Sequence, residues 1–498
     1  MDEIKIISRK SILAQLQAKE VSDVIKDKYP KISIKFITKE TRGDLDLNTP
    51  LHKMPEMGVF TSDIREGLIS GEADIAVHSW KDLPVELEEG TEVKATIKRA
   101  DLRDVLLFKK SSLKNKIVNI LTSSPRRKEN LSKFLKDAFP FEFDSCSFHD
   151  VRGNILTRIK KLKDSDQDGL VIAKAAIDRL LSNRLEDNEL ISFKYDLEEF
   201  LWMVIPASQN PCAPGQGALA LETKKGNKEI EKLISEINDL QVFKNVQNER
   251  EKLKKYGGGC HQKIGVSIED HPLGKVITEK GLTPDNEEID ERSFVPFKEE
   301  LSKFEKTVED FYPKSKKDFN LFSRSRIDDG ISEIQSLKNS GLYISRASSL
   351  EQGTSIDPSN VVWTSGIENW IKLAKKGIWV NGSSDSLGES QSKPESFGKQ
   401  VEWFLVSHDA SLSKDKMLLA TYRLEPKKET EDLSKYSHFY WMSISSFKEA
   451  LKRFPSIQNA EHSCGLGKTF EELNDIYPNK IKAFLNFEDW LEKVKEAK

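Results

Sequence analysis

Cys260 stands behind three consecutive glycines in the stretch 256–265, which reads YGGGCHQKIG. Three glycines in a row sacrifice backbone order, and a chain uses them where a turn needs positive φ or where a bound group approaches the main chain. The thiol has three interpretations: an inert buried cysteine, a nucleophile paired with His261, or the anchor of a covalently bound group. Adjacent residues rarely aim at each other, and a glycine loop suits core packing poorly, yet the stretch alone leaves all three open.

A second candidate site follows an apolar run in the segment 73–84, ADIAVHSWKDLP. The run predicts a strand, and His78, Ser79, Lys81 and Asp82 come at its carboxyl end, where the active sites of α/β proteins collect. A Lys-Asp pair in this place is also typical of a solvated turn. A Ser/His/Asp triad is not indicated, because no nucleophile elbow surrounds the serine.

Basic residues recur beside small and hydroxyl residues in five short segments of the N-terminal third. Hydroxyls and N–H groups at helix starts, together with bidentate guanidinium groups, bind planar carboxylates well. Repeated clusters favour a ligand with many carboxylates, whereas nucleic-acid binding and surface salt bridges are the alternatives. Few aromatic residues are interleaved, which argues against single-stranded nucleic acid. The segments are 8–11 (SRKS), 41–44 (TRGD), 102–104 (RD after Leu102), 122–127 (TSSPRR) and 151–158 (VRGNILTR).

The triplet Gly467-Lys468-Thr469 imitates the end of a phosphate-binding P-loop. That motif also needs a glycine five residues before Gly467, where this chain has His462. We therefore do not expect nucleotide binding there.

The elements that position these residues alternate between strand and helix. Residues 4–8 and 32–38 are β-rich, and the segment between them has apolar residues at helical spacing, which predicts a β-α-β unit. The alternation continues and begins again beyond residue 320, which indicates α/β folds with parallel sheets. Residues 227–256 predict a charged amphipathic helix or helix pair. The polar segment 385–400 predicts a loop and a candidate crossover between lobes.

Composition bounds the class of protein. The chain of 498 residues is long enough for three to five domains at roughly 100–200 residues each. Its 37% hydrophobic and 32% charged residues and net charge of −3 indicate a globular protein without a general bias toward nucleic acid or acidic lipid. Four scattered cysteines suggest neither a disulfide framework nor a metal site. Without a signal-like or membrane-spanning apolar run, we expect a cytoplasmic protein with no membrane partner.

Several motifs, taken in order, resemble those of the hydroxymethylbilane synthase family, also called porphobilinogen deaminase. The resemblance covers residues 1–310, and its motifs occur in family order with family-like spacing. They are SRKSILA, TRGD, ADIAVHSWKDLPVE, TSSPRR, VRGNILTR, APGQGALALE and GGGCHQKIG.

The resemblance implies an α/β multidomain fold. Two lobes similar to periplasmic solute-binding proteins are expected at 1–95 with 190–222 and at 96–189, followed by a small α+β cofactor-attachment domain at 223–312. It also implies a dipyrromethane cofactor held by a thioether to Cys260. The implied reaction joins four porphobilinogen molecules head to tail with release of ammonia, a step of porphyrin and heme biosynthesis, in a monomer.

The resemblance also assigns roles to residues. Loss of ammonia leaves a developing positive charge on an electron-poor pyrrole, so a carboxylate is needed, and Asp82 is expected to be the general acid/base and stabiliser. Each pyrrole bears an acetate and a propionate, which basic and hydroxyl groups would hold. Cofactor binding is expected at Cys260, Ser11, Arg9, Lys81, Thr122, Ser123, Ser124, Arg126, Arg127, Arg152, Gly153 and Arg158, and substrate binding at Arg42, Arg103 and Gln216.

The chain departs from the family pattern in three places. In segment 53–60 (KMPEMGVF) this chain has Pro55, Glu56 and Met57 where the family commonly has glycines and a lysine, so that lysine's role cannot be transferred. Leu121 replaces a usual glycine, and Lys174 stands where a small residue is usual near the substrate. Lys174 is expected either to contact a ligand carboxylate or to be a solvated residue at a strand end.

Residues 318–498 resemble, more loosely, the two-lobed α/β uroporphyrinogen-III synthase family, in segments such as NLFSRS and FYWMSISSFKEALKRF. This resemblance implies a bifunctional chain whose second activity cyclises hydroxymethylbilane with inversion of the last ring. The alternatives are a deaminase with an inactive C-terminal lobe, or a non-catalytic solute-binding module. Candidate cleft residues, which are equally typical of helix N-caps, are Thr364, Ser365, Ser443, Ser445 and Thr469.

Overall fold

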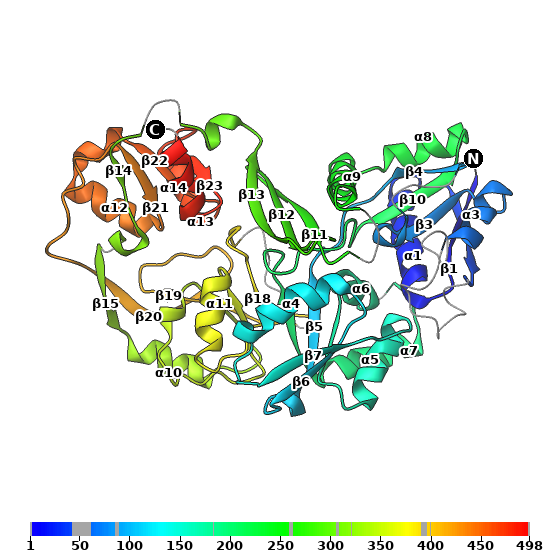
Figure 1. Ribbon diagram of the computed structural model, residues 1–498, viewed down its shortest axis with the longest axis horizontal. Coiled ribbons are helices and arrows are strands. Elements are labelled where there is room, and N and C mark those ends of the chain that lie inside the picture. Colours follow the sequence, from blue (N-terminus) through cyan, green and yellow to red (C-terminus); the bar gives the residue numbers. More distant parts are fainter. Residues whose placement is uncertain are drawn as a thin grey trace. The chain divides into compact units, whose positions relative to one another are not determined.

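The computed structural model describes residues 2–41, 61–84, 89–182, 184–257, 262–304, 308–319, 321–389, 396–398 and 400–496 (Figure 1). The chain divides into two compact units. The first consists of 1–136, 142–268 and 278–291, and the second of 137–141, 269–277 and 292–498. Both contain strands and helices in alternation, which confirms the expected α/β multidomain class.

The first sheet has the order β2-β1-β3-β10-β4. The first three strands of this order are parallel, and β10 runs antiparallel to both of its neighbours. The predicted β-α-β unit is present, because α1 connects β1 to β2 and buries Leu16, Val21 and Ile25. The elements are β1 (Glu3–Arg9), α1 (Ile12–Lys28), β2 (Ser33–Lys39), α3 (Ser62–Ile69), β3 (Ile75–Ser79), β4 (Thr91–Ala95) and β10 (Leu219–Lys224).

The second sheet repeats this arrangement in the order β7-β6-β8-β5-β9. Strands β7, β6 and β8 are parallel, and β5 is antiparallel to β8 and β9. The two sheets therefore belong to two lobes of one topology. The elements are β5 (Asp104–Lys109), β6 (Ile117–Leu121), α4 (Pro125–Ala138), β7 (Ser145–His149), α5 (Ile155–Asp164), β8 (Gly169–Ala173), α6 (Lys174–Leu180), α7 (Asn188–Leu197) and β9 (Phe200–Ile205).

Strand β9 corrects the expected boundary of the first lobe. It pairs with β5 along its whole length, so it belongs to the second sheet, although residues 190–222 were all expected in the first lobe. The chain returns to the first lobe after β9, where Ala100 donates a backbone hydrogen bond to the Gly217 carbonyl at 3.2 Å. A Cβ on Gly217 would lie 2.5 Å from the Ala100 oxygen, so the two connecting segments can approach this closely only with glycine there.

The charged stretch after β10 forms two helices, α8 (Lys228–Glu236) and α9 (Leu240–Lys254). Helix α8 buries Ile230 and Ile234 in the core of the first sheet, and α9 packs Val246 against Trp80. Both helices thus extend the first lobe, and residue 223 does not begin a separate body. What remains of the expected α+β domain is a three-stranded sheet of β11 (Gly265–His271), β12 (Gly274–Leu282) and β13 (Glu288–Pro296).

The second unit contains two further sheets. The larger has the order β15-β20-β19-β16-β17-β18, and it is parallel except for its edge strand β15. Its strands are β15 (Phe322–Arg326), β16 (Gly341–Ile344), β17 (Val361–Thr364), β18 (Gly382–Ser383), β19 (Trp403–His408) and β20 (Met417–Pro426), with helices α10 (Asp328–Ser336) and α11 (Ile367–Ala374).

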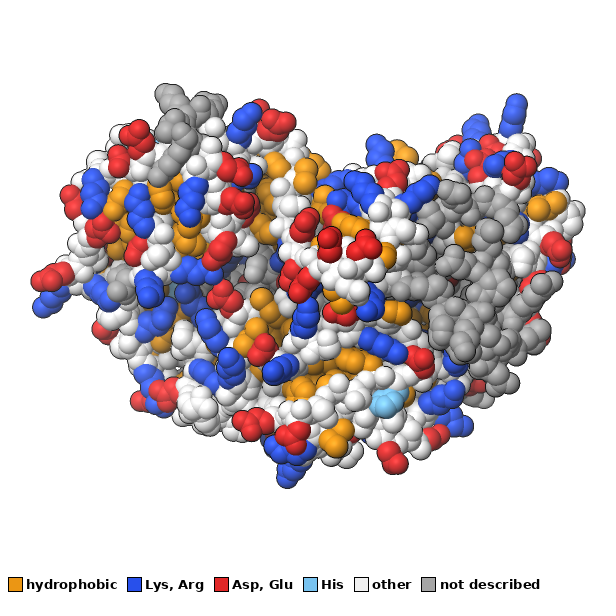
Figure 2. All heavy atoms as spheres, viewed as in Figure 1, with side chains coloured by type: hydrophobic (Ala, Val, Ile, Leu, Met, Phe, Trp, Pro, Cys, Tyr) orange, Lys and Arg blue, Asp and Glu red, His pale blue; other side chains and the backbone are white. Residues whose placement is uncertain are grey.

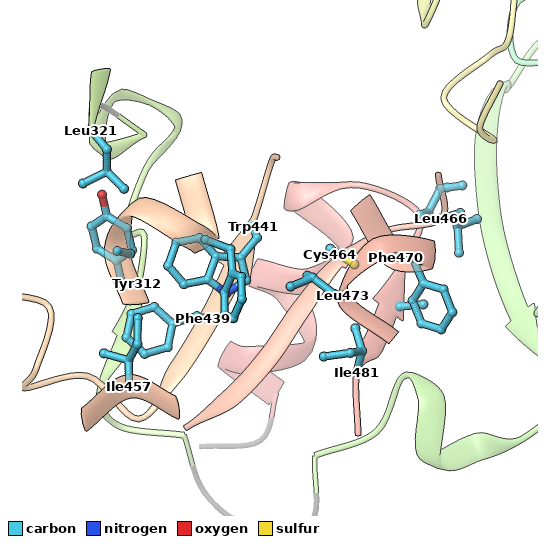
Figure 3. Close-up of a cluster of buried hydrophobic side chains, with 14 of the residues drawn as sticks. Tyr312, Leu321, Phe439, Trp441, Ile457, Cys464, Leu466, Phe470, Leu473 and Ile481 are labelled. Carbon is cyan, nitrogen blue, oxygen red and sulfur yellow. The ribbon is translucent and has the colours of Figure 1, made fainter. Parts of the chain in front are cut away.

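The smaller sheet is parallel throughout, in the order β14-β21-β22-β23. Its aromatic core includes Phe439 and Trp441, whose rings stack with centroids 5.2 Å apart, and Cys464 is buried in the same cluster (Figure 3). Its elements are β14 (Phe311–Tyr312), β21 (His438–Trp441), α12 (Ile444–Arg453), β22 (Glu461–Gly465), α13 (Lys468–Ile476), β23 (Lys482–Phe484) and α14 (Phe487–Glu496).

The expected crossover at 385–400 is wrong. The strands on either side of it, β18 and β19, both belong to the larger sheet, so the chain does not change lobes from one strand to the next. The chain passes between them instead after β14 and after β20. Among the described helices, none is both long and apolar enough to span a membrane.

Candidate active site

Asp82 lies on a short rigid turn at the carboxyl end of β3. The strand ends at Ser79, and residues Trp80–Asp82 form a single turn of 3₁₀-helix. Trp80 is buried and its ring lies 5.0 Å from that of Phe243 on α9, while Arg250 donates to the carbonyls of Trp80 and Leu83. The neighbours of Asp82 are thus anchored while its own side chain is exposed, which suits a carboxylate that must reach a ligand.

Beside Asp82, a pocket of about 80 Å³ opens between β1, the start of α1 and the end of β3. Gln17 crosses it and donates to the Ser79 hydroxyl at 2.8 Å. The buried hydroxyl of Thr61 also lines it and has no hydrogen-bond partner among the described residues. The lining side chains are Arg9, Ser11, Leu13, Ala14, Gln17, Thr61, Val77, His78, Ser79 and Asp82.

The hydroxyl residues 122–124 form the turn between β6 and α4. Ser123 both donates to and accepts from the backbone of Val151, at 2.8 Å in each case. The Thr122 hydroxyl is buried and accepts the Ser124 N–H at 3.4 Å, and the Ser124 hydroxyl accepts that of Arg127 at 3.5 Å. These side chains therefore shape the turn that carries the two arginines. Leu121, which stands where the family usually has a glycine, is buried and is the last residue of β6.

Arg126 and Arg127 are buried around one carboxylate, that of Asp104. Arg126 donates to Asp104 at 2.8 Å, and Arg127 donates to both of its oxygens at 3.0 and 2.6 Å. Burial alone would raise the pKa of Asp104, but the charges of Arg127 and Arg126 hold it well below its usual range. The sequence reasoning missed Asp104, because only the arginine of its RD pair was weighed as a ligand-binding group.

Lys81 and Gln216 continue this network toward Asp82. The Gln216 amide donates to Asp104 at 2.9 Å and to the Leu102 carbonyl at 2.7 Å, and its oxygen accepts from Lys81 at 3.1 Å. Burial lowers the pKa of Lys81, the Arg127 and Arg126 charges add to this, and the Asp82 and Asp104 charges oppose it. The side-chain amide of Gln216, which is expected to bind substrate, thus contacts Lys81, Asp104 and the Leu102 carbonyl.

Two other cations are paired within the protein. Arg103 makes a bidentate contact with Asp101, with Nη2 to Oδ2 at 2.6 Å. Lys174 is buried at the start of α6, with its ammonium 2.8 Å from Asp178 and 3.8 Å from Asp101. The expectation of a solvated Lys174 is wrong, because the side chain is buried and its charge is matched by internal carboxylates.

Arg158 supplies a cation that faces Asp82 from the second lobe. It lies on the first turns of α5 and donates to the Gly153 carbonyl at 2.8 Å. Gly153 has φ +108°, and a Cβ there would lie 2.8 Å from the Thr157 side chain, so this turn requires glycine. Within the described part of the chain, Arg158 makes no ion pair with a carboxylate.

The pKa of Arg158 depends on its burial and on the charges around it. Burial lowers its pKa to about 10, and the charges of Arg127 and Arg152 contribute in the same direction, while Asp82 opposes them. Arg158 therefore lies within electrostatic reach of Asp82 as well as of Arg127 and Arg152, and Lys81 is the neighbour of Asp82 in sequence. An arrangement with one exposed carboxylate and surplus positive charge suits a ligand that is anionic at its edges and becomes cationic where it reacts.

Three of the expected site positions lie outside the described residues. These are Cys260, Arg42 and the divergent segment 53–60. The other positions expected from the deaminase motifs lie in the two lobes of the first unit, and the five hydroxyl candidates of the C-terminal region lie in the second unit. Figure 2 shows positive and negative side chains interspersed over the described part of the visible face, so the gathering of arginines near Asp82 is a local feature.

Comparison with known proteins identifies the first unit. The family model described as "Porphobilinogen deaminase, dipyromethane cofactor binding domain" matches residues 4–232. Porphobilinogen deaminase of Syntrophomonas wolfei is 36% identical over 272 residues, covering 54% of this chain and 81% of that protein. The chain belongs to the porphobilinogen deaminase family. The enzymes of that name from Caldicellulosiruptor saccharolyticus and Dictyostelium discoideum are 36% and 32% identical, covering 53% and 54% of this chain and 84% and 79% of their own.

Solved structures add less than these deaminases do. The amino acid transporter substrate-binding protein AbpA of Streptococcus pneumoniae is 12% identical and covers 51% of this chain and 90% of its own, with a TM-score of 0.24. A score this low carries no argument about the fold. The duplicated sheet topology of this deaminase is therefore taken from its own strand pairing.

The matched part of this deaminase is a dipyrromethane cofactor-binding domain, and its residues fit that group. A dipyrromethane presents acetate and propionate groups along its edge, and Arg158 is a half-buried cation without a carboxylate of its own in the described residues. The unpaired Thr61 hydroxyl lines the pocket beside Asp82, where it could accept a further hydrogen bond. The donor set is thus suited to a ligand with several carboxylates.

Proposed function

We propose that the first unit is a hydroxymethylbilane synthase, which joins four porphobilinogen molecules head to tail and releases one ammonia for each. The observation that carries this proposal is the exposed Asp82 carboxylate on its anchored turn, within electrostatic reach of Arg158 of the second lobe. Family membership supports the same reaction. The dipyrromethane, bound through the Cys260 sulfur, would supply the free pyrrole carbon at which the chain is extended.

In this proposal Asp82 handles the proton and the charge at the reacting pyrrole. The carboxylate of Asp82 contacts the pyrrole N–H and stabilises the positive charge that develops as ammonia leaves. It also receives the proton released when the new carbon–carbon bond forms. A rigid turn matters here, because a carboxylate already held in place needs no reorganisation during the reaction.

The arginines bind and orient the substrate. Arg158 and Arg152 lie on the second lobe and Arg9 on the first, so carboxylates on a growing chain can be held from both sides. Arg126 and Arg127 are fixed by Asp104, and their remaining N–H groups donate to Asn210, to the Pro211 carbonyl and to the Val171 carbonyl, so these two arginines act on the ligand through their charge. Surplus positive charge in the free site becomes neutral when the polycarboxylate binds.

The first test replaces Asp82 with asparagine. We expect Asp82→Asn to retain the fold and to lower the rate of porphobilinogen consumption at least about 100-fold, because general acid–base catalysis contributes this much. Consumption of porphobilinogen and release of ammonia are measured together. The matched control is Asp196→Asn, which removes a carboxylate paired with Lys163 on the surface of α7. Near-normal turnover in Asp82→Asn would remove this carboxylate from the reaction.

We also propose that the second unit is a uroporphyrinogen-III synthase, which closes hydroxymethylbilane with inversion of the last ring. Its two α/β lobes and the polar residues after its parallel strands support this proposal. Thr364 and Ser365 follow β17, with the Ser365 hydroxyl donating to the Ser345 carbonyl at 3.0 Å. Ser443 caps α12, Ser445 lies in its first turn, and Thr469 lies in that of α13.

The isomer made by the intact chain tests this second activity. The chain is supplied with porphobilinogen, and its product is oxidised and separated by isomer. We expect the type III isomer to predominate, because hydroxymethylbilane closes spontaneously without ring inversion. Only the type I isomer would contradict the synthase proposal and leave the deaminase proposal intact.

A further inference from the structure

A row of polar and aromatic side chains crosses three neighbouring strands of the larger sheet in the second unit. Ile344 at the end of β16 is in register with Val406 of β19. Arg346 and His408 each lie two residues further along, so they reach the same level on the same side of the sheet. His408 is in turn in register with Tyr422 of β20. This level is the carboxyl edge of the parallel strands, where ligands of α/β proteins bind.

Arg324 joins this row from the edge strand β15. It is in register with Leu424, which places it diagonally across from Tyr422 on the same face. The Arg324 guanidinium carbon lies 5.6 Å from the centre of the Tyr422 ring, and the His408 ring lies 5.9 Å from that ring. Tyr422 is buried, so two basic side chains are held against one fixed ring.

The fourth member comes from the other lobe of the same unit. Lys468 begins α13, and its ammonium group donates to the Leu412 carbonyl in the connection between β19 and β20. This contact brings the lysine to the larger sheet beside His408. We name Arg324, Arg346 and Lys468, with the His408 imidazole beside them, the strand-edge cation cluster. A ligand held by it would touch both lobes of the unit.

The positive charges of this cluster are only partly balanced by carboxylates, since Lys468 lies 3.7 Å from Glu472 and no second such pair is seen within the cluster's described residues. Burial lowers the pKa of His408, and the Arg346, Lys468 and Arg324 charges lower it further, with only Asp409 opposing them. Asp409 itself is bound to Arg423 at 2.8 Å. Among the described residues, neither Arg324 nor Arg346 forms an ion pair with a carboxylate.

Uncompensated charge of this kind is costly to keep without a ligand. Burial lowers the pKa of Arg346, Tyr422 opposes this, and the nearby Arg324 charge adds to it. Like charges gathered in partial burial destabilise a fold unless something of opposite charge binds them. The neighbouring Arg326, by contrast, is paired with Glu351 and Asp328. Among the described residues, Arg324 and Arg346 are therefore a selective pair of cations without a carboxylate partner and not a general property of this edge.

We propose that the strand-edge cation cluster binds the carboxylates of a tetrapyrrole polycarboxylate at the carboxyl edge of the larger sheet. The identification of the ligand as a tetrapyrrole rests on the proposed synthase function, whereas the preference for a polycarboxylate follows from the cluster itself. Several carboxylates spaced around a flexible or ring-closed tetrapyrrole can meet Arg324, Arg346 and Lys468 together. Tyr422 offers an aromatic face beside them.

Binding of uroporphyrin III to the intact chain tests the proposal. This stable oxidised ring keeps all the carboxylates of the product, and its fluorescence reports binding. We expect Arg346→Gln and Arg324→Gln each to raise its Kd about tenfold or more, as loss of a charge-assisted hydrogen bond does. The matched control is Arg423→Gln, which removes an exposed arginine of β20 that already has a partner, and its Kd should stay within about twofold.

A second control separates this site from the arginines of the first unit. Arg158→Gln should leave the uroporphyrin Kd of the second unit unchanged. If Arg158→Gln weakens binding and Arg346→Gln and Arg324→Gln do not, the ligand binds at the first unit and the proposal is overturned. Arg324 is exposed, so its variant keeps the test decisive even if Arg346→Gln misfolds.

The outcome is distinguishable from that of the synthase proposal. If Arg346→Gln and Arg324→Gln bind uroporphyrin as tightly as the unaltered chain while the type III isomer is still made, the cluster is excluded and the synthase remains. If binding depends on both arginines but only the type I isomer forms, the cluster stands as a tetrapyrrole-binding site and the synthase activity fails.

Discussion

Asp82 and Asp104 are two carboxylates of one network that have different roles. Asp104 is fully buried and accepts hydrogen bonds from Arg126, Arg127 and Gln216, so it positions other groups. Asp82 is exposed and has its surroundings fixed for it by Trp80 and the turn. Burial and hydrogen bonding thus separate a positioning carboxylate from one that is free to act on a ligand.

Replacement of Asp104 by asparagine should destabilise the first unit. We expect a loss of about 3–5 kcal/mol in the free energy of unfolding, because Arg126 and Arg127 would remain buried without their partner charge. Chemical denaturation measures the loss. The same Asp196→Asn control should change stability by at most about 1 kcal/mol, since its partner Lys163 is on the surface. A loss in Asp104→Asn no larger than in this control would refute the role of Asp104 as the anchor of both arginines.

At the scale of elements, Glu222 on β10 connects neighbouring elements around the middle of the first sheet. From β10 it contacts Arg65 on α3 at 3.1 Å, His78 on β3 at 2.9 Å and Thr91 on β4 at 2.5 Å. Burial alone would raise its pKa, but the contacts with His78, Thr91 and Arg65 bring it down to about 2. One buried carboxylate therefore joins four elements on the side of the lobe that carries Asp82.

The free energy of unfolding of the first unit should decrease as the pH falls through the range in which Glu222 takes up a proton. A folded pKa of about 2, below the ordinary value of 4.5, means that Glu222 stabilises the fold fully above pH 4.5. This contribution is lost as pH falls from 4.5 toward 2, because the unfolded chain takes up the proton first.

Glu222→Gln should therefore be less stable than the unaltered chain at neutral pH and show a shallower loss of stability through that acid range. Denaturant unfolding at a series of pH values measures both. A parallel pH profile in the two proteins would show that Glu222 does not carry this dependence. The control is Glu229→Gln in the first turn of α8, which alters a helix-end carboxylate instead of the buried one.

Much of the element order could be predicted from sequence, because strand and helix periodicity are local. The β-α-β unit and the alternation beyond residue 320 are examples. Strand pairing is not local, and so β9, an apolar run like any other, was expected in the wrong sheet. The loop after β18 was misread for the same reason.

The same difference between local patterns and distant contacts applies to the prediction of site residues. Groups such as Asp82, Arg152 and Arg158 can be proposed from sequence, because their types and spacing match a chemistry. The contacts of the supporting groups could not be predicted, because they depend on partners distant in sequence. Asp104 meets Arg126 from another element, Gln216 holds Lys81, and Lys174 is matched by Asp178.

At the scale of the whole molecule, the two proposals give both units the same class of anionic ligand. The first gathers arginines around Asp82, and the second gathers cations at the edge of a parallel sheet. Each gathering is local in a chain whose net charge is only −3. Ligand selection in both units therefore depends on placed charges and not on a generally basic surface.

The mass of the intact purified chain tests the central claim, that the first unit is a deaminase built on a covalently held dipyrromethane. The account predicts a mass above that of the sequence by one dipyrromethane, and its loss in Cys260→Ser together with porphobilinogen consumption. Replacement of the buried Cys212 by serine is the control and should keep the added mass. An unmodified chain that still consumes porphobilinogen, or an added mass that persists in Cys260→Ser, would contradict the account.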